Sequence, residues 1–218
     1  MTSRSVESLS LCVCVCVFSV VAVIVNSYCT LALRIAAHLT EVWDAIDPTL
    51  PDSPHPLRVY LHEVTREAAP YLNSMAEAGI TIEVGPTPNG LLRADAVSTT
   101  ERALQLILRY LERAAAGQAP AAPRSLRVFA DQGKVAWPEA APGSKLPGAL
   151  IAPSLQDRDF EPLRTGEPMF IKPDGGVVRY DGAHGPVVYP VFVNEAAYYY
   201  AQSGRGVGLT TLVDWPLT

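Results

Sequence analysis

The chain has 218 residues, a net charge of −5, 18% charged residues and a hydrophobic fraction of 49%. This length suffices for one large domain or two small ones with a buried core. The sequence contains no cluster of lysines and arginines. The electrostatic footprint of a nucleic-acid-binding protein is therefore missing, and DNA and RNA are excluded as partners.

Residues 1–25 form the most apolar part of the chain. Leu9 to Val25 carries no charge, and its length lies at the lower limit for a membrane span. A secretory signal fits poorly, because Glu7 lies closer to this run than Arg4 does and no small-residue cleavage site follows. Cys-Val-Cys-Val-Cys is also what a TGTGTG dinucleotide repeat encodes. Two interpretations therefore have equal weight, translated non-coding sequence or a hydrophobic anchor, with a buried strand as the third.

Helical and strand patterns alternate over residues 26–118. The spacing of apolar residues predicts a helix from Leu31 to Ile46, a strand from Leu57 to His62, a short helix or turn from Arg66 to Ala78, a strand up to Val84 and a long helix from Ala94 to Ala116. Such an order favours a parallel or mixed sheet covered by helices. The sequence therefore predicts an α/β domain over this range.

The composition changes after residues 119–123, whose two prolines among small residues indicate a linker. Short β-like runs separated by Gly, Pro and Asp then follow one another: Leu126 to Ala130, Leu150 to Ala152, Met169 to Lys172, Val177 to Tyr180 and Val187 to Val193. We therefore expect residues 124–218 to form a second domain, an all-β barrel or sandwich.

Two sites suggest chemistry before any family is considered. Glu83 lies in a β-branched apolar segment that stops at a Gly-Pro, so its carboxylate belongs to the end of a buried strand. The carboxyl ends of strands in α/β sheets form ligand crevices, and a carboxylate there suits a general base. The structural alternative is that Glu83 pairs with an arginine such as Arg93 or caps the next loop.

The second site is a run of three tyrosines near the end of the chain. A strand ends at Asn194, which can cap a short helix that starts at Glu195 and carries residues 198–200. A phenol at a pocket edge donates a hydrogen bond to a substrate carboxylate or carbonyl. The alternative is a packed aromatic ring whose hydroxyl is satisfied internally.

Three segments together resemble one known family. They are Ile82 to Asp95, which contains Glu-Val-Gly-Pro, Leu155 to Leu163, which contains Gln-Asp-Arg-Asp-Phe-Glu-Pro, and Val188 to Tyr199, which contains Asn-Glu-Ala-Ala-Tyr-Tyr. Their order and spacing resemble aspartoacylase and the N-acyl-aromatic-L-amino-acid amidohydrolase, the AstE/AspA-type zinc deacylases. The resemblance runs from about Asn26 to Tyr200 and covers the C-terminal two-thirds of such an enzyme.

The resemblance implies a zinc-carboxypeptidase-like α/β domain followed by a small β domain, in a cytoplasmic enzyme that deacylates N-acyl amino acids. It implies that Glu83 is the general acid/base, that Tyr198 binds substrate, and that zinc is the cofactor. The family's His-x-x-Glu and Asp-Leu-His-Asn ligand segments have no counterpart in this chain. If Asn26 to Leu33 is aligned without gaps on the family's Asn-containing segment, the position of the family's third ligand histidine falls at Val21. No metal ligand is nominated, since no ligand spacing is reproduced by the four histidines, His38, His55, His62 and His184.

The first hypothesis is therefore a zinc-dependent amidohydrolase of N-acyl amino acids whose chain is truncated and lacks the metal ligands. The alternatives are a non-catalytic truncated or mispredicted homologue that acts as a binding protein, and a succinylglutamate desuccinylase-like deacylase. The absence of Arg and Lys between Glu67 and Glu83 favours the aromatic-amino-acid branch. The expected partner is a small N-acyl amino acid. A membrane is an expected partner only if residues 9–25 are an anchor. The sequence leaves open whether the chain forms a homo-oligomer.

Overall fold

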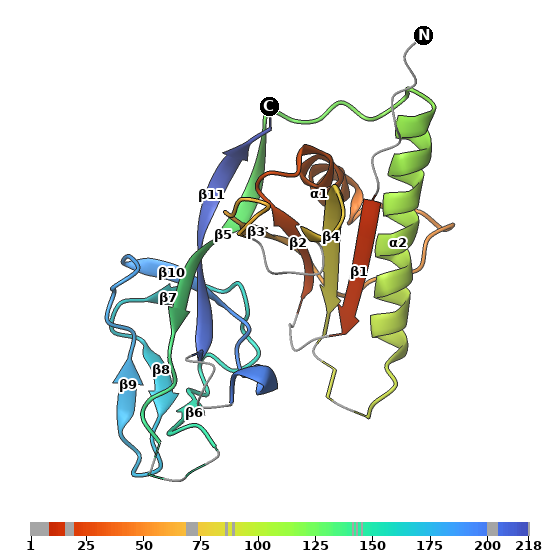
Figure 1. Cartoon of the computed structure of the whole chain (residues 1–218). Coiled ribbons are helices and arrows are strands. Elements are labelled where there is room, and N and C mark those ends of the chain that lie inside the picture. The colour runs from red at the N-terminus through yellow and green to blue at the C-terminus, as the bar shows by residue number, and fades with distance from the viewer. Residues whose placement is uncertain are drawn as a thin grey trace.

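The computed structural model describes residues 9–15, 20–68, 74–85, 87–88, 90–140, 142, 144, 146–199 and 205–217. Its main feature is an eight-stranded mixed sheet in the order β1-β4-β2-β3-β5-β11-β10-β7, with a three-stranded sheet, β6-β8-β9, beside one end (Figure 1). The elements in chain order are β1 (Leu9–Val15), β2 (Val21–Asn26), α1 (Thr30–Val42), β3 (Leu57–His62), β4 (Ala78–Val84), α2 (Ala94–Ala115), β5 (Ser125–Val135), β6 (Leu150–Ile151), β7 (Leu163–Arg164), β8 (Pro168–Ile171), β9 (Val177–Arg179), β10 (Val187–Val191), η2 (Ala196–Tyr198) and β11 (Val207–Pro216).

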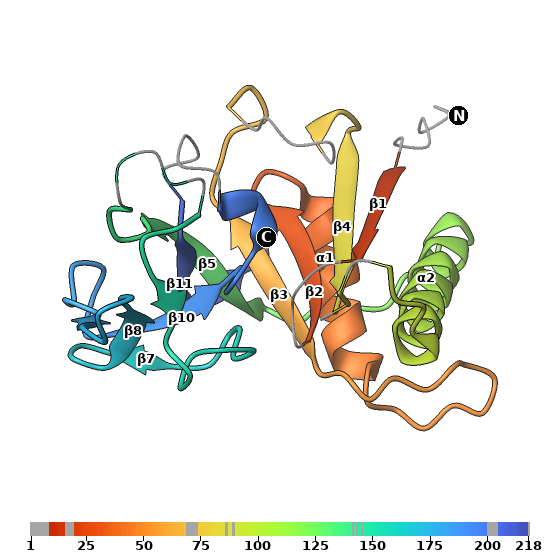
Figure 2. The same ribbon diagram turned by 90° about the horizontal axis from the view of Figure 1, so that it is seen from below.

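Both α-helices cover the same face of the sheet (Figure 2). The apolar stripes of α1 and α2 pack with alternate residues of β2 and β4 in one core cluster, which includes Val21, Val23, Ile35, Ile82 and Ile107. This is the amphipathic arrangement that the helical periodicity predicts. The predicted α/β class is confirmed.

The opposite face of the sheet is covered by the C-terminal part of the chain. Ala22 and Ile24 of β2 point to this side, where they join a second core cluster with Tyr60, Phe129 and Val191. All six residues of β2 are buried. A strand that is buried on both faces has a continuous run of apolar residues, and this explains why residues 21–25 are all apolar.

Two parts of the apolar N-terminal segment, Leu9–Val15 and Val21–Asn26, are strands, and a buried strand was the third interpretation of this segment after an artefact and an anchor. Strand β1 pairs in parallel with β4, and β2 lies between β3 and β4. The expected boundary at residue 25 falls inside β2. Within the described ranges, no helix is both long and apolar enough to cross a bilayer.

The β-rich C-terminal part is continuous with the first sheet. Strand β5 pairs in parallel with β3 and, along its length, antiparallel with β11. The predicted β module is present, but its described strands form two open sheets and no closed barrel. Strand β11 was not predicted, because Gly206 and Gly208 interrupt the start of its pattern.

The predicted end of the first helix was wrong by four positions. Helix α1 ends at Val42, and Ile46 is 101% exposed, so it lies off the buried face. Arg102 of α2 is buried beside this helix end and donates to the carbonyl oxygens of Trp43 and Ala45 at 3.1 and 2.9 Å. These contacts satisfy carbonyls that would otherwise accept from a further helical turn.

Candidate active site

Glu83 lies on the sheet face that is turned away from the helices. Alternation along β4 sends Ile80 and Ile82 into the helix-covered core, so Thr81 and Glu83 point to the other side. Glu83 is 9% exposed and lines a cavity of about 210 Å³. Arg93, the arginine that the sequence suggested as a structural partner of Glu83, donates from Nε to Asp95 Oδ1 at 3.0 Å at the start of α2.

Tyr198 lines the same cavity, although it is more than a hundred residues further along the chain. It closes the 3₁₀ helix η2, whose N-cap is Glu195, since the Glu195 carboxylate accepts from the Ala197 N–H at 3.1 Å. The predicted cap, Asn194, was wrong. Its side chain accepts a hydrogen bond from the Tyr199 hydroxyl.

The Tyr198 phenol is kept protonated by its surroundings. Burial raises the pKa of Tyr198 to about 12, and the carboxylates of Glu195 and Glu83 contribute in the same direction. Arg205 acts in the opposite direction, but its effect is smaller than that of burial. At neutral pH the phenol is therefore a hydrogen-bond donor.

The second motif of the sequence holds the loop that leads to η2. Asp159 is 2% exposed, and its Oδ1 accepts from the Val193 N–H at 3.0 Å. The next residue, Phe160, donates its N–H to the Pro190 carbonyl at 2.8 Å. These bonds fix the end of β10 from outside the cavity, so Asp159 positions the segment that carries Tyr198.

A β-bulge in β5 aims two further charged residues at the cavity. Thr210 pairs with Asp131 and Leu209 pairs with Gly133, so Gln132 has no partner in the ladder. Gly133 has a φ of 104°, and its N–H donates to Asp131 Oδ1 at 3.0 Å. The extra residue places Asp131 and Lys134 on the same face of the strand, and both line the cavity.

His62, the last residue of β3, completes the ionisable group. It is 8% exposed, its Nδ1 lies 3.7 Å from Asp131 Oδ2, and its ring meets Tyr60 edge-on at 4.6 Å. Burial raises the pKa of Asp131, but hydrogen bonds from His62 and Gly133 outweigh it, so that pKa lies below its usual value. At the mouth lies Arg205, whose Cζ is 5.5 Å from the centroid of the Tyr198 ring.

The structure thus brings together the two residues predicted from the sequence and adds four that were missed, His62, Asp131, Lys134 and Arg205. His62 could have been found by the rule that strand ends carry ligand sites. The face that Asp131 and Lys134 share depends on the bulge, for which Gln132-Gly133 is only a weak signal. Arg205 follows residues 200–204, which lie outside the described residues.

The cavity residues do not fit a zinc centre. His62, Glu83 and Asp131 share the cavity, yet within the described part of the chain no three His, Cys, Asp or Glu side chains form a group that could hold a metal ion. The stretch between Glu67 and Glu83 includes residues 69–73, which are outside the described residues.

The fold matches that of the AstE/AspA class of proteins. Residues 124–205 match the family model of the AstE/AspA barrel-sandwich hybrid domain. The crystal structure of murine aminoacylase 3 superposes with a TM-score of 0.77 at 30% identity, over 99% of this chain and 66% of that chain.

Curated sequences give the same result. Rat aspartoacylase is 37% identical over 176 residues, which are 80% of this chain and 54% of the rat protein. The mouse N-acyl-aromatic-L-amino acid amidohydrolase is 41% identical over 145 residues, which are 66% of this chain and 44% of the mouse protein. The resemblance seen in the sequence is confirmed, and the chain is a relative of the aspartoacylases. It spans about half the length of the curated relatives it matches.

Proposed function

We propose that this chain is the part of an N-acyl amino acid deacylase that supplies the acid–base carboxylate and a substrate-orienting phenol. One observation carries the proposal, namely that Glu83 and Tyr198 line one cavity although they come from opposite halves of the chain. The names of the relatives, aspartoacylase and N-acyl-aromatic-L-amino acid amidohydrolase, support this reaction class. A cytoplasmic location stays an expectation from the sequence.

The proposed chemistry is hydrolysis of an amide. A water molecule in the cavity gives a proton to Glu83 while its oxygen attacks the acyl carbonyl carbon. Glu83 then returns the proton to the nitrogen as the C–N bond breaks, which releases a carboxylate and a free amino acid. Tyr198, protonated at neutral pH, donates a hydrogen bond to a substrate oxygen and fixes its orientation.

Zinc is implied as a cofactor only by the resemblance to the family. The described residues offer no ligand set that could hold the metal ion. The same observation favours the second candidate, a non-catalytic homologue that binds an N-acyl amino acid without cleaving it. The desuccinylase-like alternative has only a likeness of fold behind it, to a Shewanella amazonensis protein with a TM-score of 0.50 and 12% identity, and this likeness favours no particular activity.

The experiment is a hybrid protein that joins this chain to the third of murine aminoacylase 3 that it does not cover. We expect the hybrid to release acetate from N-acetyl amino acids. Glu83→Gln should lower kcat by several orders of magnitude with little change in substrate binding, because the amide cannot take the proton.

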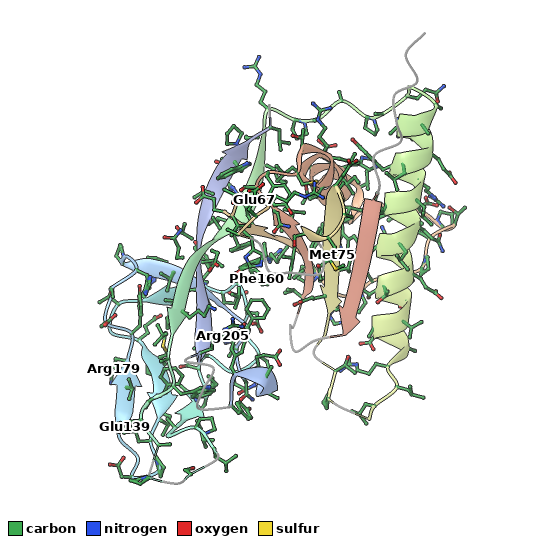
Figure 3. The ribbon with its side chains drawn as sticks, viewed as in Figure 1. Glu67, Met75, Glu139, Phe160, Arg179 and Arg205 are labelled. Carbon is green, nitrogen blue, oxygen red and sulfur yellow. The ribbon has the colours of Figure 1, made fainter. Side chains whose placement is uncertain are left out.

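Glu139→Gln is the matched control, since Glu139 is exposed, does not line the cavity and lies near the outer end of the C-terminal part (Figure 3). It should leave kcat unchanged. A folded hybrid with near-normal turnover after Glu83→Gln would remove Glu83 from the mechanism. A folded hybrid that binds N-acetyl amino acids without cleaving them would favour the binding protein.

A further inference from the structure

We propose that Lys134 and Arg205 form a carboxylate-binding subsite at the mouth of the Glu83 cavity, where they hold the free carboxylate of an N-acyl amino acid. The inference rests on the proposed function, since it names the part of the substrate that these cations recognise. Neither residue belongs to the sequence motifs that resemble the family.

The backbone brings the two cations together. Lys134 pairs with Gly208 in the β5–β11 ladder, and Arg205 lies just before the start of β11, beside the lower half of this ladder (Figure 3). Gly208 adds no side chain between them, and a Cβ there would come 2.8 Å from Val191 Cγ2. The bulge at Gln132 turns Lys134 to the cavity side.

The charged residues that line the cavity differ in how deeply they are buried. Glu83 and His62 are 9% and 8% exposed, whereas Lys134 and Arg205 are exposed residues that also line the cavity. Asp131, the other carboxylate, lies within 3.7 Å of His62. A ligand with its carboxylate at the rim therefore meets two cations first and directs its amide towards Glu83.

The two cations also repel each other. Burial lowers the pKa of Lys134, and the Arg205 charge lowers it further, while Asp131 acts in the opposite direction. A carboxylate bound between them relieves this repulsion. The planar Arg205 guanidinium can also bind both oxygens of a carboxylate at once, which a lysine cannot do.

The test uses the 218-residue chain itself, without added metal. N-acetyl-L-phenylalanine and its C-terminal amide, which lacks the carboxylate, are titrated by NMR or calorimetry. We expect the acid to bind about five- to tenfold more tightly than the amide, as befits a partly exposed charged pair. Arg205→Gln or Lys134→Gln should remove most of this preference, and Arg205→Lys, which keeps the charge, should retain part of it.

Arg124→Gln is the matched control, because Arg124 is exposed at the opposite end of the β5–β11 ladder. It should leave the preference intact. The subsite is overturned if the wild-type chain binds acid and amide equally or binds neither. It is also overturned if Arg205→Gln keeps the preference, or if Arg205→Lys loses it as completely as Arg205→Gln does, since packing on Tyr198 would then explain the effect.

Failure of the subsite and failure of the proposed function are distinguishable. If the chain prefers the acid but the hybrid protein cleaves nothing, the subsite is supported and the deacylase function is contradicted. If the hybrid cleaves N-acetyl amino acids and its KM is unchanged after Arg205→Gln, the deacylase function is supported and the subsite is contradicted.

Discussion

At the residue scale, the cavity depends on side chains that never touch it. Asp159 is buried beneath the loop before η2 and accepts the Val193 N–H through one oxygen. Its other oxygen, Oδ2, is buried and has no hydrogen-bond partner among the described residues. A carboxylate in such a place is stable in its neutral form and costly in its charged form.

This environment predicts a pH-dependent stability. Burial raises the pKa of Asp159 from 3.8 to about 7, so its contribution is fully present below pH 4 and is lost as the pH rises through 7. Asp159→Asn keeps the Oδ1 acceptor and removes the titration. Urea unfolding between pH 4 and pH 8 should therefore give a free-energy difference that shifts steadily in favour of Asp159→Asn as the pH rises. Parallel curves for the two proteins would contradict the assignment.

At the element scale, the bulge in β5 decides which residues face the cavity. A regular strand would place Asp131 and Lys134 on opposite faces, because they are three positions apart. The bulge adds one residue and restores them to one face, and Gly133 adopts the left-handed backbone that this requires. Bulges of this kind are frequent beside functional sites.

Gly133→Ala tests the bulge. The new Cβ would lie 3.6 Å from His184 Cε1, an ordinary contact, so the cost comes from the φ of 104° and not from a clash. We expect the free energy of unfolding to fall by about 1–2 kcal/mol. Gln132→Ala, at the exposed bulge position, should change it by less than about 0.5 kcal/mol. Equal urea midpoints for the two variants would mean that the backbone there does not need glycine.

At the scale of the whole molecule, Glu83, Tyr198 and four further acidic or basic residues line one cavity, and the described residues include no metal-binding group. The cavity is built where the helix-free face of β2, β3 and β4 meets the C-terminal module, so it needs both halves of the chain. The second sheet β6-β8-β9 lies at the far end of that module (Figure 1).

Metal content is the corresponding prediction. We expect the purified 218-residue chain to carry well under one zinc ion per molecule by mass spectrometry after dialysis against zinc, and to show no deacetylase activity. The physical reason is that zinc needs at least three protein ligands in a catalytic site, and the described residues offer no such group. Stoichiometric zinc bound after dialysis would refute this expectation.

The sequence by itself determined the α/β class, most elements within a few residues, and the nomination of Glu83 and Tyr198. It could do so because hydrophobic periodicity and the family motifs are local signals. Only the tertiary structure decided that the two side chains share one cavity and that His62, Asp131, Lys134 and Arg205 surround them. That grouping depends on strand register, on one bulge and on pairing between distant segments, and none of these is encoded within a short window of the chain.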